Sequence, residues 1–139
     1  MAGNPPRPTQ RIVPYLYVDD VAAYLAFLSQ AFGFETRVHE VDPNDPEHVH
    51  AQAALGDALV MVGHASTKWG TASARRLPAR HSGIYVLVDD VDAHCGRARA
   101  AGATIEAEPA DMDWGDRMYT ARDPEGQQWY FATPRPPGG

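Results

Sequence analysis

The chain has 139 residues, of which 44% are hydrophobic, and a formal net charge of −6 at neutral pH. This length suits one domain with a real hydrophobic core, and the acidic balance argues against nucleic acid as a partner. The apolar runs are far shorter than the ~20 residues that cross a bilayer, and the N-terminus lacks a signal-peptide apolar region, so no membrane partner is expected.

The first half of the chain predicts a strand, a helix and three further strands. Residues 11–18, RIVPYLYV, alternate in a strand-like pattern, and Asp19 and Asp20 then supply an N-cap. The helix that follows has an apolar stripe ending at Phe32, and Gly33 is expected to stop it. The segments FETRVHEV, EHVHAQAAL and DALVMV then predict three strands.

The second half repeats this order. GIYVLV predicts a strand, Asp89 and Asp90 are expected to cap a helix, and Gly102 is expected to end it. ATIEAE, RMYTARD and QQWYFAT predict three more strands. The helix contains Cys95, the only cysteine, which is expected to be a small core residue. Because it cannot form an internal disulfide, a reducing cytoplasmic location is expected.

A short motif marks the repeat. LYVDDV at 16–21 returns as VLVDDV at 86–91, seventy residues later. The predicted fold class is α+β, with two βαβββ modules forming an open cup-shaped mixed sheet and helices on the outer face. The expected organisation is a Pro-rich arm at 1–10, one domain at 11–134 and a flexible tail at 135–139. Within that domain, modules at 11–63 and 82–134 flank a linker at 64–81.

This duplicated pattern, over roughly residues 10–134, resembles the vicinal oxygen chelate superfamily, which includes glyoxalase I, extradiol dioxygenases and bleomycin-resistance proteins. Many members hold a metal with side chains from the first and last strand of each module. The resemblance maps those ligand positions onto four residues, and none of them is a suitable donor for a divalent metal: Val13, Val60, Gly83 and Tyr130. No metal or other cofactor is therefore expected.

A narrower resemblance concerns the bleomycin-resistance proteins. It rests on Trp114-Gly115-Asp116-Arg117 and on the turn Asp123-Pro124-Glu125-Gly126. It implies a metal-free homodimer that sequesters a flat cationic drug at the subunit boundary, with the tryptophan stacking on that drug. Arg37 lies where such drug binders can use acidic contacts, which argues against bleomycin itself.

The residues around Trp114 favour the same chemistry. The indole lies within EAEPADMDWGD, among Glu106, Glu108, Asp111, Asp113 and Asp116. An aromatic face among carboxylates suits a planar cation. The alternative is a solvated acidic loop whose tryptophan packs over the second helix.

Strand alternation predicts the remaining lining of the cup. If Val13 and Gly83 face inward, so do Tyr15 and Tyr85, whereas Trp129 should be core. Trp69, in the linker, is expected to close the mouth of the cup. The full expected ligand-binding set is Trp114, Tyr15, Tyr85, Tyr130, Val60, His48, His50, Trp69, Tyr119 and Phe32.

The sequence thus favours a metal-independent protein, more a binder than an enzyme, that sequesters an aromatic natural product or antibiotic as a self-resistance device. His48 and His50 support the alternative hypothesis of an enzyme, because their HxH spacing is a recurrent metal-binding pattern. That alternative is a lyase, isomerase or dioxygenase of the same superfamily with a relocated His-based metal site. A third alternative is a ligand-sensing or accessory protein.

Overall fold

The computed structural model describes residues 10–136. The expected Pro-rich arm lies outside the described residues except for Gln10, and the expected flexible tail is described only for Arg135 and Pro136. No helix in the described part of the chain is long and apolar enough to cross a membrane.

The first module forms a four-stranded sheet with its helix on one face. Its elements are β1 (Tyr15–Val18), α1 (Val21–Phe27), a π-helical turn η1 (Leu28–Phe32), β2 (Glu35–Asp42), β3 (Asp45–Leu55) and β4 (Ala58–His64). The strand order is β1-β4-β3-β2, with β1 parallel to β4 and the other pairs antiparallel.

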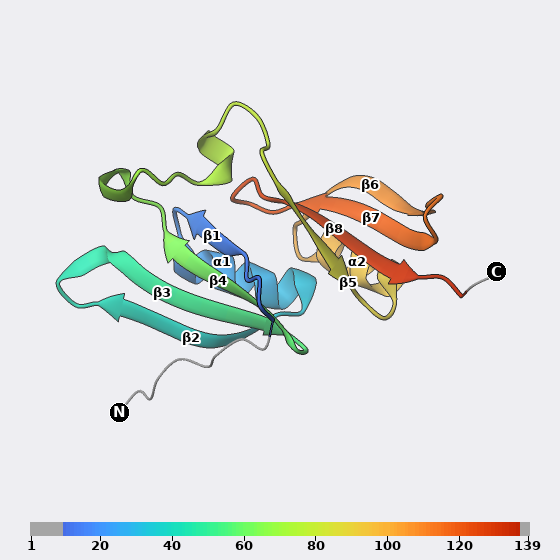
Figure 1. Ribbon diagram of the computed structural model, residues 1–139, viewed down its shortest axis with the longest axis horizontal. Helices are drawn as coiled ribbons and strands as arrows, with labels where there is room; N and C mark the ends of the chain where they lie inside the picture. Colours follow the sequence, from blue (N-terminus) through green and yellow to red (C-terminus); the bar gives the residue numbers. More distant parts are fainter. Residues whose placement is uncertain (1–9, 137–139) are drawn as a thin grey trace.

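The second module repeats this topology. Its elements are β5 (Gly83–Leu87), α2 (Val91–Ala100), β6 (Thr104–Asp111), β7 (Asp116–Arg122) and β8 (Gln128–Pro134), in the order β5-β8-β7-β6. Figure 1 shows the two sheets side by side, with β2 and β6 at the outer edges. The predicted α+β fold of two βαβββ modules is confirmed, and within residues 10–136 the sheets do not close into a barrel.

The repeated aspartates cap the two helices as the sequence predicts. The Asp20 carboxylate accepts a hydrogen bond from the backbone N–H of Ala23 at 3.0 Å, and Asp90 accepts one from Ala93 at 3.1 Å. Each carboxylate satisfies a backbone donor that the first turn of the helix leaves free. Gly33 adopts a positive φ of 82° at the end of η1, a conformation that glycine reaches without steric cost.

One hydrophobic core joins the two modules. Phe32 of η1 lies 5.3 Å from Trp129 and 4.7 Å from Phe131, measured between ring centroids, and all three side chains are fully buried. His94 of α2 places its Nε2 atom 2.9 Å from the Phe32 carbonyl oxygen. The helical segment of the first module therefore packs directly on the last strand of the second.

The turn between β7 and β8 forms a buried polar joint with the first module. The Asp123 carboxylate accepts hydrogen bonds from the Tyr24 hydroxyl at 2.6 Å and from the Trp129 indole N–H at 2.9 Å. Glu125, also buried, accepts from the backbone N–H groups of Asp19 and Asp20 at the start of α1. Burial raises the pKa of Asp123, although the hydrogen bonds that it accepts lower it. The joint fixes the orientation of one module against the other.

The segment between β4 and β5 crosses from one sheet to the other (Figure 1). It contains two short 3₁₀ turns, η2 (Thr67–Trp69) and η3 (Ala74–Arg76). The Ser73 hydroxyl in this segment donates a hydrogen bond of 2.5 Å to Glu125, so the linker is tied to the same polar joint.

Candidate ligand-binding site

Two tyrosines lie on the face of the second sheet that points away from the core. Tyr85 of β5 pairs in register with Tyr130 of β8, and their rings stack with centroids 6.0 Å apart. A Cβ atom on Gly83 would lie 2.5 Å from the Tyr130 ring, so the ring rests directly on the backbone of β5. Glycine at this position allows the tyrosine to lie flat on the sheet.

Trp114 stands beside this tyrosine pair, in the turn between β6 and β7. Its indole N–H donates a hydrogen bond of 3.1 Å to the Tyr85 hydroxyl, which in turn donates one of 2.6 Å to the Asp116 carboxylate. Even so, 62% of Trp114 is exposed to solvent. The hydrogen bond holds the edge of the indole while most of its surface stays available for stacking.

Hydrogen bonding also affects the ionisation of Tyr85. Desolvation and the bond to Asp116 raise the pKa of Tyr85, and the bond from Trp114 acts in the opposite direction. The phenol is therefore neutral at physiological pH and acts as both acceptor and donor. Trp114, Tyr85, Asp116 and Tyr130 are hereafter called the aromatic face.

The carboxylates near Trp114 are less available than the sequence indicates. Three of the five expected around the indole form ion pairs with arginines: Glu106 with Arg80, Glu108 with Arg99, and Asp111 with Arg117. Asp116 accepts the tyrosine hydrogen bond, and Asp113 forms no ion pair within residues 10–136. Of the five carboxylates, only Asp113 and Asp116 therefore lack an arginine partner within residues 10–136.

The corresponding face of the first module has a different character. Tyr15 and Tyr17 lie 5.2 Å apart and are each about two-fifths exposed. The Tyr15 hydroxyl is 3.4 Å from His50 Nδ1, and His50 Nε2 is 3.0 Å from the side-chain nitrogen of Gln52. Gln52 is only 2% exposed, and its Oε1 has no hydrogen-bond partner among the described residues. A buried acceptor without a partner costs about 1–3 kcal/mol.

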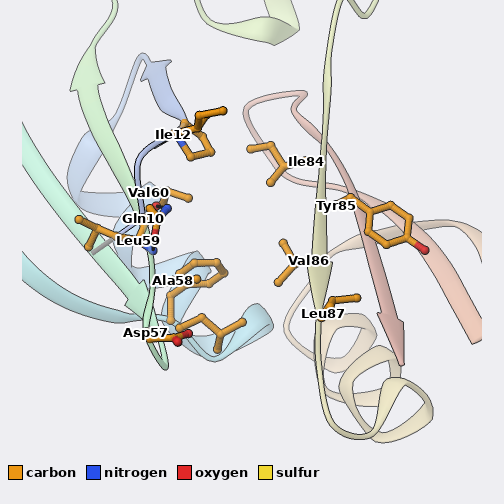
Figure 2. A pocket seen from close by; sticks show the side chains of 13 residues that line it. Gln10, Ile12, Asp57, Ala58, Leu59, Val60, Ile84, Tyr85, Val86 and Leu87 are labelled. Atoms are coloured by element: carbon orange, nitrogen blue, oxygen red, sulfur yellow. Dashed lines mark hydrogen bonds between the residues drawn. The ribbon is translucent and has the colours of Figure 1, made fainter. Parts of the chain in front are cut away.

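A cavity of about 380 Å³ lies between the two modules, next to the core that joins them (Figure 2). Its volume falls within the range of small-molecule sites. Figure 2 shows Ile84 and Val86 of β5 directed across the cavity toward the first module, whereas the Tyr85 ring points away from it. On the opposite wall, the Gln10 side chain bonds both the N–H and the C=O of Leu59, which holds the start of the described chain along β4. Strand β5 thus contributes one face to the cavity and the other to the aromatic face.

Two residues expected to bind ligand belong to the core instead, and a third, Val60, lies between the core and the cavity. Phe32 packs against Trp129 and Phe131, and Tyr119 is fully buried with its hydroxyl 2.6 Å from His94 Nδ1. Val60 is 5% exposed, although it also borders the cavity.

The strand register explains the position of Val60. Tyr15 pairs with Met61 in the first module, whereas Tyr85 pairs with Tyr130 in the second. Met61 is thus the counterpart of Tyr130, and Val60 is the counterpart of the buried Trp129. A one-residue shift moves a side chain to the opposite face of a strand.

Trp69 and His48 form a separate cluster at the end of the β2–β3 hairpin. Their rings lie 6.0 Å apart in an edge-to-face arrangement, and the Lys68 ammonium is 5.1 Å from the Trp69 ring centroid. Lys68 also forms a 2.8 Å ion pair with Asp45, and His48 lies 3.2 Å from Asp42. Trp69 is 56% exposed, but its contacts are with this hairpin and not with the aromatic face.

Comparison with known proteins identifies the family. The profile of the glyoxalase/bleomycin resistance protein/dioxygenase superfamily matches residues 10–131. The chain belongs to this superfamily.

Sequence and structural relatives agree with this assignment. An uncharacterised protein of Mycobacterium tuberculosis is 31% identical over 125 residues, covering 87% of this chain and 72% of the relative. The crystal structure of TioX from a Micromonospora species is 30% identical with a TM-score of 0.69, covering 89% of this chain and 98% of TioX. The fosfomycin resistance protein FosX of Listeria monocytogenes shares only the fold, with 14% identity, a TM-score of 0.66 and coverage of 90% and 91%.

The metal site of many superfamily members does not fit the residues found here. At the four corresponding positions this chain has Val13, Met61, Gly83 and Tyr130, and the Tyr130 ring covers Gly83. Valine and glycine have no donor, and thioether and neutral phenol oxygen are poor donors for a divalent metal.

A relocated histidine site also lacks a ligand set in the described structure. Within residues 10–136, no three His, Cys, Asp or Glu side chains are grouped so that they could hold a metal ion. His48 and His50 project toward different partners, Asp42 and Tyr15.

Several residues of the site were not singled out from the sequence. Tyr17 could have been found, because it follows Tyr15 at the two-residue period of β1. Gln52 and the cavity residues Ile12 and Phe34 carry no local signal, since their positions depend on how the two modules pack.

Proposed function

We propose that this superfamily member is a metal-independent binding protein that holds a planar aromatic molecule on the aromatic face. The observation that carries the proposal is Trp114, whose indole is held at its edge by Tyr85 yet is 62% exposed. Stacking on such a ring is worth about 0.5–1.5 kcal/mol beyond area burial, and a desolvated cation over it about 2 kcal/mol. Fixing the indole before binding reduces the entropy lost when the ligand arrives.

A cationic ligand is favoured by Asp113 and Asp116, the carboxylates that arginines leave free beside the indole. The name of the superfamily includes a drug-resistance protein, which supports an antibiotic or another aromatic natural product as the ligand and self-resistance by sequestration as the role. The buried free thiol of Cys95 agrees with the proposed cytoplasmic location.

The proposal includes a homodimer. The edge strands β1 and β5 each carry two side chains that are more than 40% exposed on the outward face: Tyr15, Tyr17, Tyr85 and Leu87. A monomer would leave these side chains in water. A second copy would cover them and could close a ligand against the aromatic face, burying at least about 1,200 Å² in total. Light scattering at micromolar concentration should give twice the chain mass, and a monomer would refute this part.

The ligand class can be tested with ethidium, a planar aromatic cation, and with a neutral aromatic molecule of similar size. Ethidium should quench tryptophan fluorescence and bind more tightly than the neutral probe. Asp116→Asn should weaken ethidium binding about two- to thirtyfold, because it removes the charge beside the rings, and should leave the neutral probe little affected.

The matched control is Asp89→Asn, which removes one negative charge from an exposed position before α2. If both variants weaken ethidium equally, the effect is one of net charge and the assignment of Asp116 is wrong. If neither probe binds the parent protein, the aromatic face is not the ligand site.

A further inference from the structure

A second cavity, of about 510 Å³, lies between the linker and the end of the second sheet. Its walls come from η3 and the residues after it, from Thr104 at the start of β6, from Arg122 at the end of β7, and from the turn at 123–126. The Arg75 N–H donates a 2.8 Å hydrogen bond to the Glu125 carbonyl oxygen. A Cβ atom on Gly126 would lie 2.6 Å from the Arg75 nitrogen, so linker and turn are in close contact. The cavity is therefore bounded by fixed backbone.

Arginines outnumber the accessible carboxylates around this cavity, although the chain as a whole is acidic. Arg75 and Arg76 share one carboxylate, Asp19, with nitrogen–oxygen distances of 2.9 and 2.8 Å. Similarly, Glu106 forms two hydrogen bonds with Arg80 and lies 3.7 Å from Arg122. Four guanidinium groups thus share two carboxylates.

Arg122 is the least satisfied of these arginines. Its distance to Glu106 is too long for a hydrogen bond, and the side chain donates none to any residue in 10–136. A guanidinium group offers five N–H donors in a planar fork, which matches the oxygens of a phosphate group. The side chain is 43% exposed, so these donors are accessible.

The carboxylates of the adjacent turn do not compete for this fork. Asp123 lines the cavity, but one of its oxygens accepts from the backbone N–H groups of Glu125 and Gln127. The other accepts from Tyr24 and Trp129. The Glu125 carboxylate is likewise turned inward, to the start of α1 and to the linker. Both carboxylates of this turn are buried and hydrogen-bonded to neutral groups, whereas the side chains of Arg75, Arg80 and Arg122 are partly exposed.

We infer that this cavity binds a phosphate-bearing small molecule, with Arg122 as the principal contact and the unused donors of Arg75 and Arg80 beside it. Bidentate hydrogen bonds from arginine to phosphate are about twice as strong as neutral ones. The volume exceeds what a lone phosphate group needs, and Leu77, Pro78 and Ala79 offer apolar surface for an organic portion. The site is built from residues that take no part in the aromatic face, so the two proposals stand or fall separately.

The test is calorimetric titration of the full-length chain at constant ionic strength with inorganic phosphate, pyrophosphate and glycerol phosphate. Saturable binding is expected, tightest for pyrophosphate or for the ester. Citrate, which carries carboxylates and no phosphate, should bind at least tenfold more weakly. Pyrophosphate in preference to the ester would indicate that charge determines affinity, and the reverse preference would indicate that the organic portion contributes; either result supports the site.

Arg122→Gln should weaken binding at least tenfold, and Arg122→Lys should recover only part of it, because lysine restores the charge without the fork. Arg37→Gln is the matched control, since Arg37 is about equally exposed and lies on β2, paired with Glu35. Its affinity should equal that of the parent protein. Absence of saturable heat with every phosphate probe, tight citrate binding, or equal losses in Arg122→Gln and Arg37→Gln would each overturn the inference.

Discussion

The two modules share an element order and a pair of capping aspartates, yet they differ at the hairpin before the last strand. In the first module, Leu55 pairs with Ala58 across a turn of two residues, Gly56 and Asp57. In the second, Arg122 pairs with Gln128 across a loop of five residues, 123–127. Gly56 and Gly126 are separated by the seventy-residue spacing of the repeat, yet they hold different positions in their hairpins. The spacing of the repeat is thus kept in the first strand of each module and shifted by one residue in the last strand.

The longer loop gives the second module a role that the first lacks. Asp123 and Glu125 accept hydrogen bonds from α1, from its N-terminal backbone and from the linker, so this loop joins all three parts of the chain. The short turn of the first module instead borders the open cavity between the modules. The loop thus connects the modules, whereas the short turn leaves space between them.

The outward faces of the two sheets differ in the same way. In the first module, Tyr15 contacts His50, which in turn contacts the buried Gln52, so this set is mainly polar. The second presents Trp114 with Tyr85 and Tyr130, a mainly aromatic set. A ligand contacting both kinds of surface would need an aromatic ring system and a hydrogen-bonding group.

The largest expected effect concerns the corresponding buried positions of the two last strands, Trp129 and Val60. Trp129→Ala should reduce the free energy of unfolding by about 3–5 kcal/mol, because it leaves a large cavity beneath Phe32 and Phe34. Val60→Ala, at the corresponding position of the first module, should cost about 1.5 kcal/mol for two buried methyl groups. Urea denaturation measures both. No loss at Val60 would mean that the register assigned to β4 is wrong.

A smaller effect should distinguish the two hairpins. Asp123→Ala removes the acceptor for Tyr24 and Trp129 and should cost about 1–3 kcal/mol in unfolding free energy, since buried donors lose their partner. Asp57→Ala, in the exposed turn of the first module, should change stability by less than about 0.5 kcal/mol. Equal effects in the same denaturation experiment would contradict the role given to the longer loop.

The pH dependence of stability should reveal the contact between α2 and η1. Burial lowers the pKa of His94 most strongly, Arg97 also lowers it, and the bond to the Phe32 carbonyl opposes them. Its neutral ring accepts from the Tyr119 hydroxyl and donates to the Phe32 carbonyl oxygen, and protonation would remove the acceptor.

Because the folded pKa lies below the unfolded value of about 6.5, the unfolded chain binds more protons between the two values. The contribution of His94 is therefore complete above about pH 6.5 and is lost as the pH falls toward the lowered pKa. Unfolding measured from pH 8 to pH 5 should show this loss, and His94→Gln should flatten the curve over that window. An unchanged slope in the variant would assign the titration to another group.

The sequence predicted the parts of the fold that depend on local pattern. Asp20 and Asp90 cap their helices, and Trp129 lies in the core, because N-caps and strand alternation depend on near neighbours in the chain. The counterpart of Tyr130 is Met61 and not Val60, as the sequence indicated, because the register of β4 depends on the length of the turn before it.

Local sequence pattern predicted less of the candidate site. Phe32 is buried by contacts between the modules, and Tyr119 is buried by the packing of α2 on the second sheet. Arg80, which pairs with Glu106, comes from the linker, and no spacing rule places it beside that acid. Arg117 pairs with Asp111 across the β6–β7 hairpin, where the two residues are in register. Ion pairing between neighbouring elements therefore determines how much negative charge remains near Trp114.

The most direct test of the proposed aromatic face is to measure ethidium affinity and melting temperature together on the Trp114→Ala variant. The indole is exposed and lies in a turn, so its removal should leave the melting temperature close to that of the parent protein. Affinity should fall by roughly 1–3 kcal/mol, about five- to 150-fold, because the variant loses both the stacking contact and the exclusion of water around it. A variant that unfolds at a much lower temperature yet binds ethidium as tightly as the parent would show that Trp114 is structural and that the ligand binds elsewhere.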